Sequence, residues 1–170
     1  MDELGRLTAE AFRKADKMPI IIVLENIRSM QNVGSVFRTC DAFRVAELWL
    51  AGYTPQPPHR DIHKTALGST ESVAWQACET GPVAVARLRL RGYKVYAVEQ
   101  AEPSTSLEQL QWDGHSPLAL VFGNEAMGVE EATLACCDGC IEIPQLGTKH
   151  SLNISVAAGV VLWELVRKQV

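Results

Sequence analysis

The sequence predicts an α/β fold, with a mostly parallel sheet and helices on both faces. Several short runs are rich in Val, Ile and Leu and apolar on both faces, which is typical of strands buried inside a parallel sheet. Stretches with helical spacing of apolar residues lie between several of these runs, as the crossover connections of a parallel sheet require. The length of 170 residues fits one domain, and such a chain buries enough surface to fold without disulfides or a structural metal.

The expected elements follow one another along the chain. Residues 8–17 predict a short helix that Pro19 ends, so 1–18 form a short N-terminal helical segment and 19–170 a single domain. The apolar runs predict strands at residues 20–25, 47–52, 71–76, 93–100, 117–123 and 139–143.

Three longer helices are expected at residues 32–43, 82–91 and 152–168. Pro82 in the first turn and Gly92 after the last turn favour the second of these helices. The Pro-rich stretch 52–61 predicts a loop, and surface loops often carry substrate contacts.

The composition constrains the compartment and the partners. The chain has 20 acidic and 16 basic side chains, a net charge of −4, which argues against nonspecific, charge-driven binding to nucleic acid. No apolar run is long enough to cross a bilayer and the start is too polar for a signal peptide, so a cytoplasmic protein without a membrane partner is expected. The odd number of cysteines, five, fits a reducing compartment. No metal site is expected. Cys137 and Cys140 are closely spaced, as are His59 and His63, but neither pair has further ligands at matching spacing.

Three segments that follow apolar strands carry the chemistry. The first, Asn26–Thr39, places Asn32 at an expected helix start, where an amide side chain and free backbone donors can hold an anion. The second, Gly123–Val129, has two glycines around a carboxylate, which suits a backbone that approaches a ligand closely. The third, Ile143–Gly159, places Ser151 as a cap of the last helix.

Simpler interpretations of each segment remain open at this level. Asn32 alone could be an ordinary helix cap beside solvent-facing arginines, and the third segment alone could be a capped helix in which Lys149 and His150 add positive charge. The glycine pattern is neither that of a dinucleotide-binding loop nor that of a Walker A loop, and no G-x-S-x-G elbow occurs.

Taken together, the order and spacing of the three segments resemble the SpoU, or TrmH-like, RNA 2'-O-ribose methyltransferases of the SPOUT superfamily. The resemblance covers about Ile20–Leu165. The matching patterns are N-x5-N-x-G-x3-R-T from Asn26, G-N-E-x-x-G-V from Gly123 and I-P-x-x-G-x3-S-L-N from Ile143.

The resemblance implies a deep C-terminal trefoil knot, S-adenosylmethionine as cofactor, and a homodimer with active sites near the subunit interface. It implies that Arg38 contacts the ribose hydroxyl and that Arg38 can do so across the dimer interface. Asn32 would hold Arg38 or a substrate phosphate. Glu125 would position the nucleophile or Asn153, while Ser151 and Asn153 would orient the ribose. The candidate cofactor-binding residues are Val98, Glu99, Gly123, Ile143 and Leu152.

The expected partner is RNA, which basic side chains would contact locally despite the acidic total. These candidates are Arg13, Lys14, Arg28, Arg44, Arg60, Lys64 and Lys149. Arg44 departs from the family pattern, which usually has Gly there. The leading hypothesis is methylation of tRNA at a D-loop guanosine; the alternatives are an rRNA methyltransferase and a knotted RNA-binding adaptor without catalysis.

Overall fold

The computed structural model describes residues 7–149 and 151–169. Residues 1–6 of the expected N-terminal segment and His150 lie outside this range. Seven strands form one sheet in the order β3-β2-β1-β6-β4-β7-β5, and all six neighbouring pairs are parallel. The strands are β1 (Met18–Glu25), β2 (Val45–Ala51), β3 (Trp75–Cys78), β4 (Lys94–Val98), β5 (Thr105–Ser106), β6 (Leu118–Phe122) and β7 (Gly139–Glu142).

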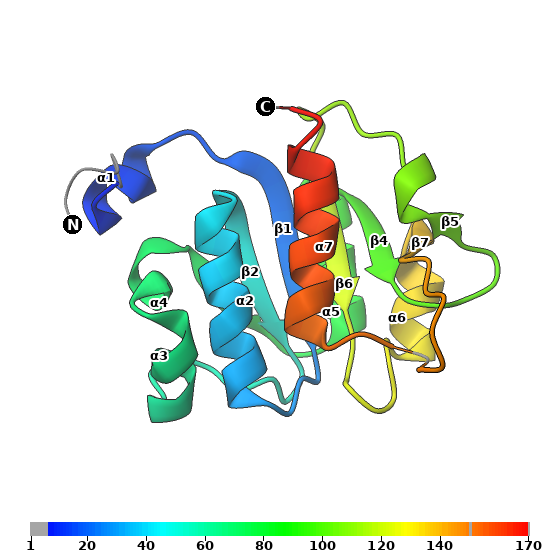
Figure 1. Ribbon diagram of the computed structural model, residues 1–170, viewed down its shortest axis with the longest axis horizontal. Coiled ribbons are helices and arrows are strands. Elements are labelled where there is room, and N and C mark those ends of the chain that lie inside the picture. The colour runs from blue at the N-terminus through cyan, green and yellow to red at the C-terminus, as the bar shows by residue number, and fades with distance from the viewer. Residues whose placement is uncertain (1–6, 150, 170) are drawn as a thin grey trace.

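Helices cover both faces of the sheet (Figure 1). One face carries α2 (Met30–Ala42), α3 (Arg60–Ala66), α4 (Ser69–Ser72) and α7 (Ile154–Val166). The other face carries α5 (Gly81–Leu90) and α6 (Glu131–Cys136). A short α1 (Ala9–Lys14) packs near α4, and a 3-10 turn, η1 (Leu107–Gln109), follows β5.

The two-sided burial of β1 confirms the prediction made from its apolar run. Ile20, Ile22 and Leu24 pack into one core layer, whereas Ile21 and Val23 pack into the other, and all five are fully buried. The α/β class and the parallel sheet are therefore as predicted. No helix within residues 7–149 or 151–169 has both the length and the apolar character needed to cross a membrane.

Three local predictions were wrong. Residues 71–76 do not form one strand, because α4 occupies 69–72 and β3 begins only at Trp75. Ser29 rather than Asn32 caps α2, accepting a hydrogen bond from the Asn32 backbone N–H at 3.2 Å. Asn153 rather than Ser151 caps α7, since its Oδ1 accepts from the Ser155 N–H at 2.9 Å. In both helices the actual cap is the last residue with non-helical backbone angles, which sequence spacing does not determine.

The strand register determines where the three chemical segments meet. Leu24 of β1 pairs with Leu50 of β2 and with Phe122 of β6, so these three strands end at the same edge. β1 and β6 are also where the strand order reverses direction, and ligands of such sheets bind in the crevice at this point. The segments after β1, β2 and β6 are therefore neighbours in space.

Candidate functional site

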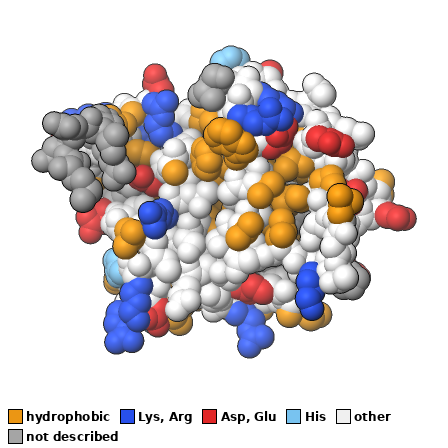
Figure 2. Space-filling view, viewed as in Figure 1, with side chains coloured by type: hydrophobic (Ala, Val, Ile, Leu, Met, Phe, Trp, Pro, Cys, Tyr) orange, Lys and Arg blue, Asp and Glu red, His pale blue; other side chains and the backbone are white. Residues whose placement is uncertain are grey.

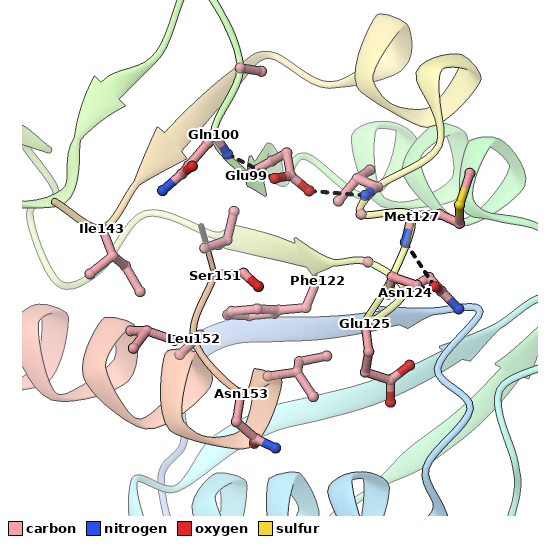
Figure 3. Close-up of a pocket in the computed structure, with 18 of the residues that line it drawn as sticks. Glu99, Gln100, Phe122, Asn124, Glu125, Met127, Ile143, Ser151, Leu152 and Asn153 are labelled. Atoms are coloured by element: carbon pink, nitrogen blue, oxygen red, sulfur yellow. Dashed lines mark hydrogen bonds between the residues drawn. The ribbon is translucent and has the colours of Figure 1, made fainter. Parts of the chain in front are cut away.

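A cavity of about 650 Å³ opens at this edge of the sheet, between the loop after β6, the residues after β4 and the segment that enters α7 (Figure 3). Eight of the candidates chosen from the sequence line it, namely Val98, Glu99, Gly123, Glu125, Ile143, Ser151, Leu152 and Asn153. In Figure 3, the Phe122 side chain lies in the middle of the lining residues. Glu99 and Gln100 lie on one side of it, and Leu152 and Asn153 lie on the other.

Asn124 holds the loop after β6 in place, although sequence reasoning did not select it. Its side-chain oxygen accepts hydrogen bonds from the backbone N–H groups of Ala126 (2.8 Å) and Met127 (2.9 Å). Its amide group donates to the Asn26 carbonyl (2.7 Å) and to the Tyr53 hydroxyl (3.0 Å). Its position inside the G-N-E motif was the available signal. This one side chain joins the ends of β1, β2 and β6.

The same loop packs tightly against Glu99. The Glu99 carboxylate accepts hydrogen bonds from the N–H groups of Val129 (3.1 Å) and Gln100 (2.9 Å). Gly128 has a φ of +72°, and a Cβ there would lie 2.3 Å from the Glu99 carboxylate. A Cβ at Gly123 would lie 2.2 Å from the Gly128 backbone. Both glycines are therefore required for the close packing that shapes this wall of the cavity.

Glu125, Asn32 and Asn153 form a hydrogen-bonded chain across the three segments. The Glu125 carboxylate accepts from the Asn32 amide (3.1 Å) and from the backbone N–H groups of Arg28 (3.1 Å) and Ser29 (3.2 Å). The Asn32 oxygen accepts from the Asn153 amide at 3.2 Å. Burial by itself raises the pKa of the Glu125 carboxyl, but the hydrogen bonds, led by that from the Arg28 N–H, outweigh burial and lower this pKa. The carboxyl is therefore ionised at neutral pH.

A second, shallower hollow of about 360 Å³ adjoins the cavity at Glu125 and Ala126, and Arg28, Ser29 and Asn32 complete its lining. The two hollows share Glu125 and Ala126 as their common wall. Each could therefore hold one of two reactants that meet at this carboxylate.

Arg38 is the one catalytic candidate that the structure does not bring to this site. It lies on the exposed side of α2 and lines neither hollow. Within the described part of the chain, no hydrogen bond or ion pair engages its side chain. The guanidinium is therefore free to bind something outside this subunit.

Glu25, a residue that the sequence did not single out, anchors the far end of the loop after β6. Its carboxyl is fully buried at the end of β1 and accepts hydrogen bonds from the Glu130 N–H (2.9 Å) and the Thr133 hydroxyl. Burial raises the pKa of Glu25, and these two hydrogen bonds only partly offset that effect. The contacts attach the start of α6 to the sheet behind the cavity.

The basic candidates fall into two groups. Arg60 and Lys64 share Asp61 as an ion-pair partner, Lys14 pairs with Glu10, and Arg13 donates to a backbone carbonyl at 2.8 Å. The other three are exposed, and no carboxylate of residues 7–149 or 151–169 forms an ion pair with them; they are Arg28, Arg44 and Lys149. The second group has its full charge available for a polyanion.

Comparison with protein-family models finds the SpoU rRNA Methylase family over residues 19–163 of this chain. The chain belongs to this family. Among curated relatives, the tRNA (guanosine(18)-2'-O)-methyltransferase of Thermus thermophilus is 34% identical over 167 residues, covering 98% of this chain and 84% of that protein. The 23S rRNA (guanosine-2'-O-)-methyltransferase RlmB of Pseudomonas aeruginosa is 29% identical over 160 residues, covering 94% of this chain and 63% of that protein.

Solved structures of RNA-modifying enzymes share the fold described above. The A. aeolicus TrmH/SpoU tRNA modifying enzyme superposes with a TM-score of 0.83 at 25% identity, covering 95% of this chain and 82% of that one. The AdoMet-bound rRNA methyltransferase from Sinorhizobium meliloti gives a TM-score of 0.83 at 25% identity, covering 94% and 60%. The three segments identified from the sequence thus occur within the matched region of a SpoU fold.

Proposed function

We propose that this protein transfers a methyl group from S-adenosylmethionine to a ribose 2'-hydroxyl of RNA. The observation that carries the proposal is the hydrogen-bonded chain of Glu125, Asn32 and Asn153, which joins all three segments between two adjoining hollows. The names of the relatives, which act on tRNA and rRNA, support the same reaction class.

The larger cavity fits the cofactor in size and chemistry. Its volume of about 650 Å³ lies in the range of small-molecule sites. Apolar walls at Val98, Phe122 and Ile143 suit a purine ring, while the carboxylates of Glu99 and Glu125 suit the positive charge of a sulfonium. When bound, S-adenosylmethionine supplies the methyl group that the ribose oxygen accepts. Gly123 and Gly128 let the backbone lie close to such a ligand.

The chain's own residues would orient the ribose and favour loss of the hydroxyl proton. Ser151 and Asn153 offer a hydroxyl and an amide at the rim of the cavity, positioned to hold ribose oxygens. Glu125 keeps Asn153 oriented through Asn32. Arg38 is permanently protonated, so it would stabilise the developing alkoxide rather than remove the proton, which an RNA phosphate or water would accept.

We further propose that Arg38 reaches the site of a partner subunit in a homodimer. Arg38 lines neither hollow of its own subunit, and α7, which packs on α2, carries an exposed apolar stripe. Val156, Val160 and Trp163 are 51%, 38% and 57% exposed and follow helical spacing. Figure 2 shows apolar side chains gathered over and beside α7, as an interface between copies would require.

Mixed dimers test this arrangement. Arg38→Ala and Asn153→Ala should each lose methyl transfer by about 100-fold or more. If Arg38 acts across the interface, a random mixture of the two subunits contains one intact site in half of its dimers and regains about a quarter of the wild-type rate. Confirmed mixed dimers with no recovery would contradict action across the interface.

The RNA class is also part of the proposal. We favour tRNA, because the tRNA methyltransferase from Thermus matches nearly the whole length of this chain, with rRNA as the alternative. Labelled S-adenosylmethionine, incubated with unmodified tRNA or rRNA, distinguishes the two. Normal cofactor binding without labelling of either RNA would favour the adaptor without catalysis.

Two finer features complete the proposal. We infer a trefoil knot, supported by the path of the chain: from β7, which β4 separates from β6 in the sheet, the chain returns to α7, which packs on α2. Stretching single molecules by their two ends tests this, since a tightened knot shortens the fully extended chain.

We also place the reaction in the cytoplasm, which the five free thiols support.

A further inference from the structure

Tyr53 is an exposed aromatic ring fixed at both ends. Its residue surface is 63% exposed, whereas its backbone N–H donates to Asn26 Oδ1 (3.2 Å) and its hydroxyl accepts from Asn124 Nδ2 (3.0 Å). The next residue, Thr54, is buried and anchors the turn: its hydroxyl has the Leu24 and Ala51 carbonyls within reach of its one hydrogen and accepts from the Ile27 N–H. The ring is therefore ordered, although most of it faces solvent.

This ring is hydrogen-bonded to a residue that lines the larger cavity. Asn124, which holds the Tyr53 hydroxyl, lines the larger cavity and directly precedes Glu125, the common wall of the two hollows. Arg28, exposed and without a carboxylate partner among the described residues, lines the smaller hollow on the same edge. An ordered aromatic ring and a free guanidinium thus lie at the edge of the sheet where the two hollows open, the ring through Asn124 and the guanidinium as part of the smaller hollow.

We propose that Tyr53 is a stacking platform for an unstacked nucleobase of the RNA, next to the methylated ribose. This inference rests on the proposed function of the site. Sequence-selective RNA recognition commonly splays bases out of the helix and stacks them on aromatic side chains. Because the turn already orders the ring, stacking costs little additional conformational entropy. The polar tip of the ring is bound within the protein, so the ring face is the part that remains available to a ligand.

A substitution series separates the ring from its hydroxyl. Tyr53→Phe and Tyr53→Trp keep an aromatic face, whereas Tyr53→Leu keeps apolar bulk without one. Leu90→Ala is the matched control, because Leu90 is 90% exposed at the end of α5 on the other face of the sheet. For each protein, binding of a fluorescein-labelled, unmodified tRNA transcript is followed by anisotropy. S-adenosylmethionine affinity and the KM for RNA are measured in parallel.

We expect the Phe, Trp and Leu90 variants to bind RNA within about twofold of wild type. Tyr53→Leu should weaken RNA binding and raise the KM for RNA by roughly 5- to 100-fold, the range for losing one stacked base. Its cofactor affinity should stay unchanged. Unchanged RNA binding by the Leu variant overturns the proposal, as does an equal loss in the Phe variant, or a parallel loss of cofactor affinity.

The proposed function and this inference fail in different ways. If the wild type binds RNA but transfers no methyl group, the catalytic proposal fails, and the anisotropy series still decides the role of the ring. If the wild type methylates RNA and Tyr53→Leu matches it in every measurement, only the stacking role is lost. If the wild type does not bind RNA at all, both proposals are contradicted.

Discussion

Replacing Glu125 by Gln tests whether the carboxylate orders the active site. In the structure its two oxygens accept three hydrogen bonds, one at Oε2 from Arg28 and two at Oε1 from Ser29 and Asn32. Gln has the same shape but only one acceptor oxygen. In its better orientation the amide keeps two of these contacts and places an N–H₂ group against the third donor.

The expected cost follows from the hydrogen bonds affected. A hydrogen bond to a charged group contributes about 1.5 to 3 kcal/mol when shielded from water. Glu125 is exposed to solvent, which can replace part of the lost contact, so we expect a loss of about 1 to 2 kcal/mol. That corresponds to a decrease in kcat/KM of roughly 5- to 30-fold.

The assay is transfer of labelled methyl groups to RNA, with Glu108→Gln as a matched control, because Glu108 is an exposed residue of η1. Because hydrogen bonds lower the pKa of Glu125, its carboxyl stays ionised between pH 6 and 8. The ratio of wild-type to Glu125→Gln rates should therefore be constant over that range. Equal kcat/KM values for wild type and Glu125→Gln would refute the ordering role, and a ratio that changes across neutral pH would refute the ionised state.

Three further predictions concern the backbone and the core. Arg44 has a φ of +49°, so Arg44→Gly should raise stability by about 1 kcal/mol and Tm by roughly 2 to 4 °C; Arg44→Ala should gain nothing in the same thermal melts. Burial raises the pKa of Glu25, so the wild type loses stability as pH rises through that pKa. In thermal melts from pH 4 to 8, the stability of Glu25→Gln relative to wild type should therefore increase as pH rises. The exposed variant Glu131→Gln should show no such trend. Gly123→Ala should weaken S-adenosylmethionine binding at least about tenfold by calorimetry, because its Cβ would lie 2.2 Å from backbone atoms, while Gly147→Ala, with open space around it, should bind normally.

Much of the fold was predictable because its signals are local. The two-sided apolar run of β1 indicated a buried parallel strand, and Pro82 and Gly92 marked the bounds of α5 within about one residue. The short elements were not predictable in this way. α4 and β3 have four residues each, and tertiary contacts rather than propensity determine where such elements begin.

Part of the cavity lining was predictable from the sequence, whereas the hydrogen bonds that connect it were not. Six of the eight cavity residues belong to the motif patterns, which place polar groups and glycines after apolar strands, whereas Val98 and Glu99 were expected only from the family resemblance. The hydrogen bond from Asn153 to Asn32 joins residues 121 positions apart, and spacing along the chain says nothing of such a contact. Asn124 and Tyr53 were missed for the same reason, because their roles arise only where β1, β2 and β6 end together.

The most direct test of the central claim is to identify the product of the reaction. Unmodified cellular RNA is incubated with the protein and S-adenosylmethionine carrying a labelled methyl group, and the RNA is then digested to nucleosides and separated. We expect label in a single 2'-O-methylated nucleoside, lost in Arg38→Ala while the cofactor still binds. Label on a base, or no label in any RNA despite normal cofactor binding, would contradict it.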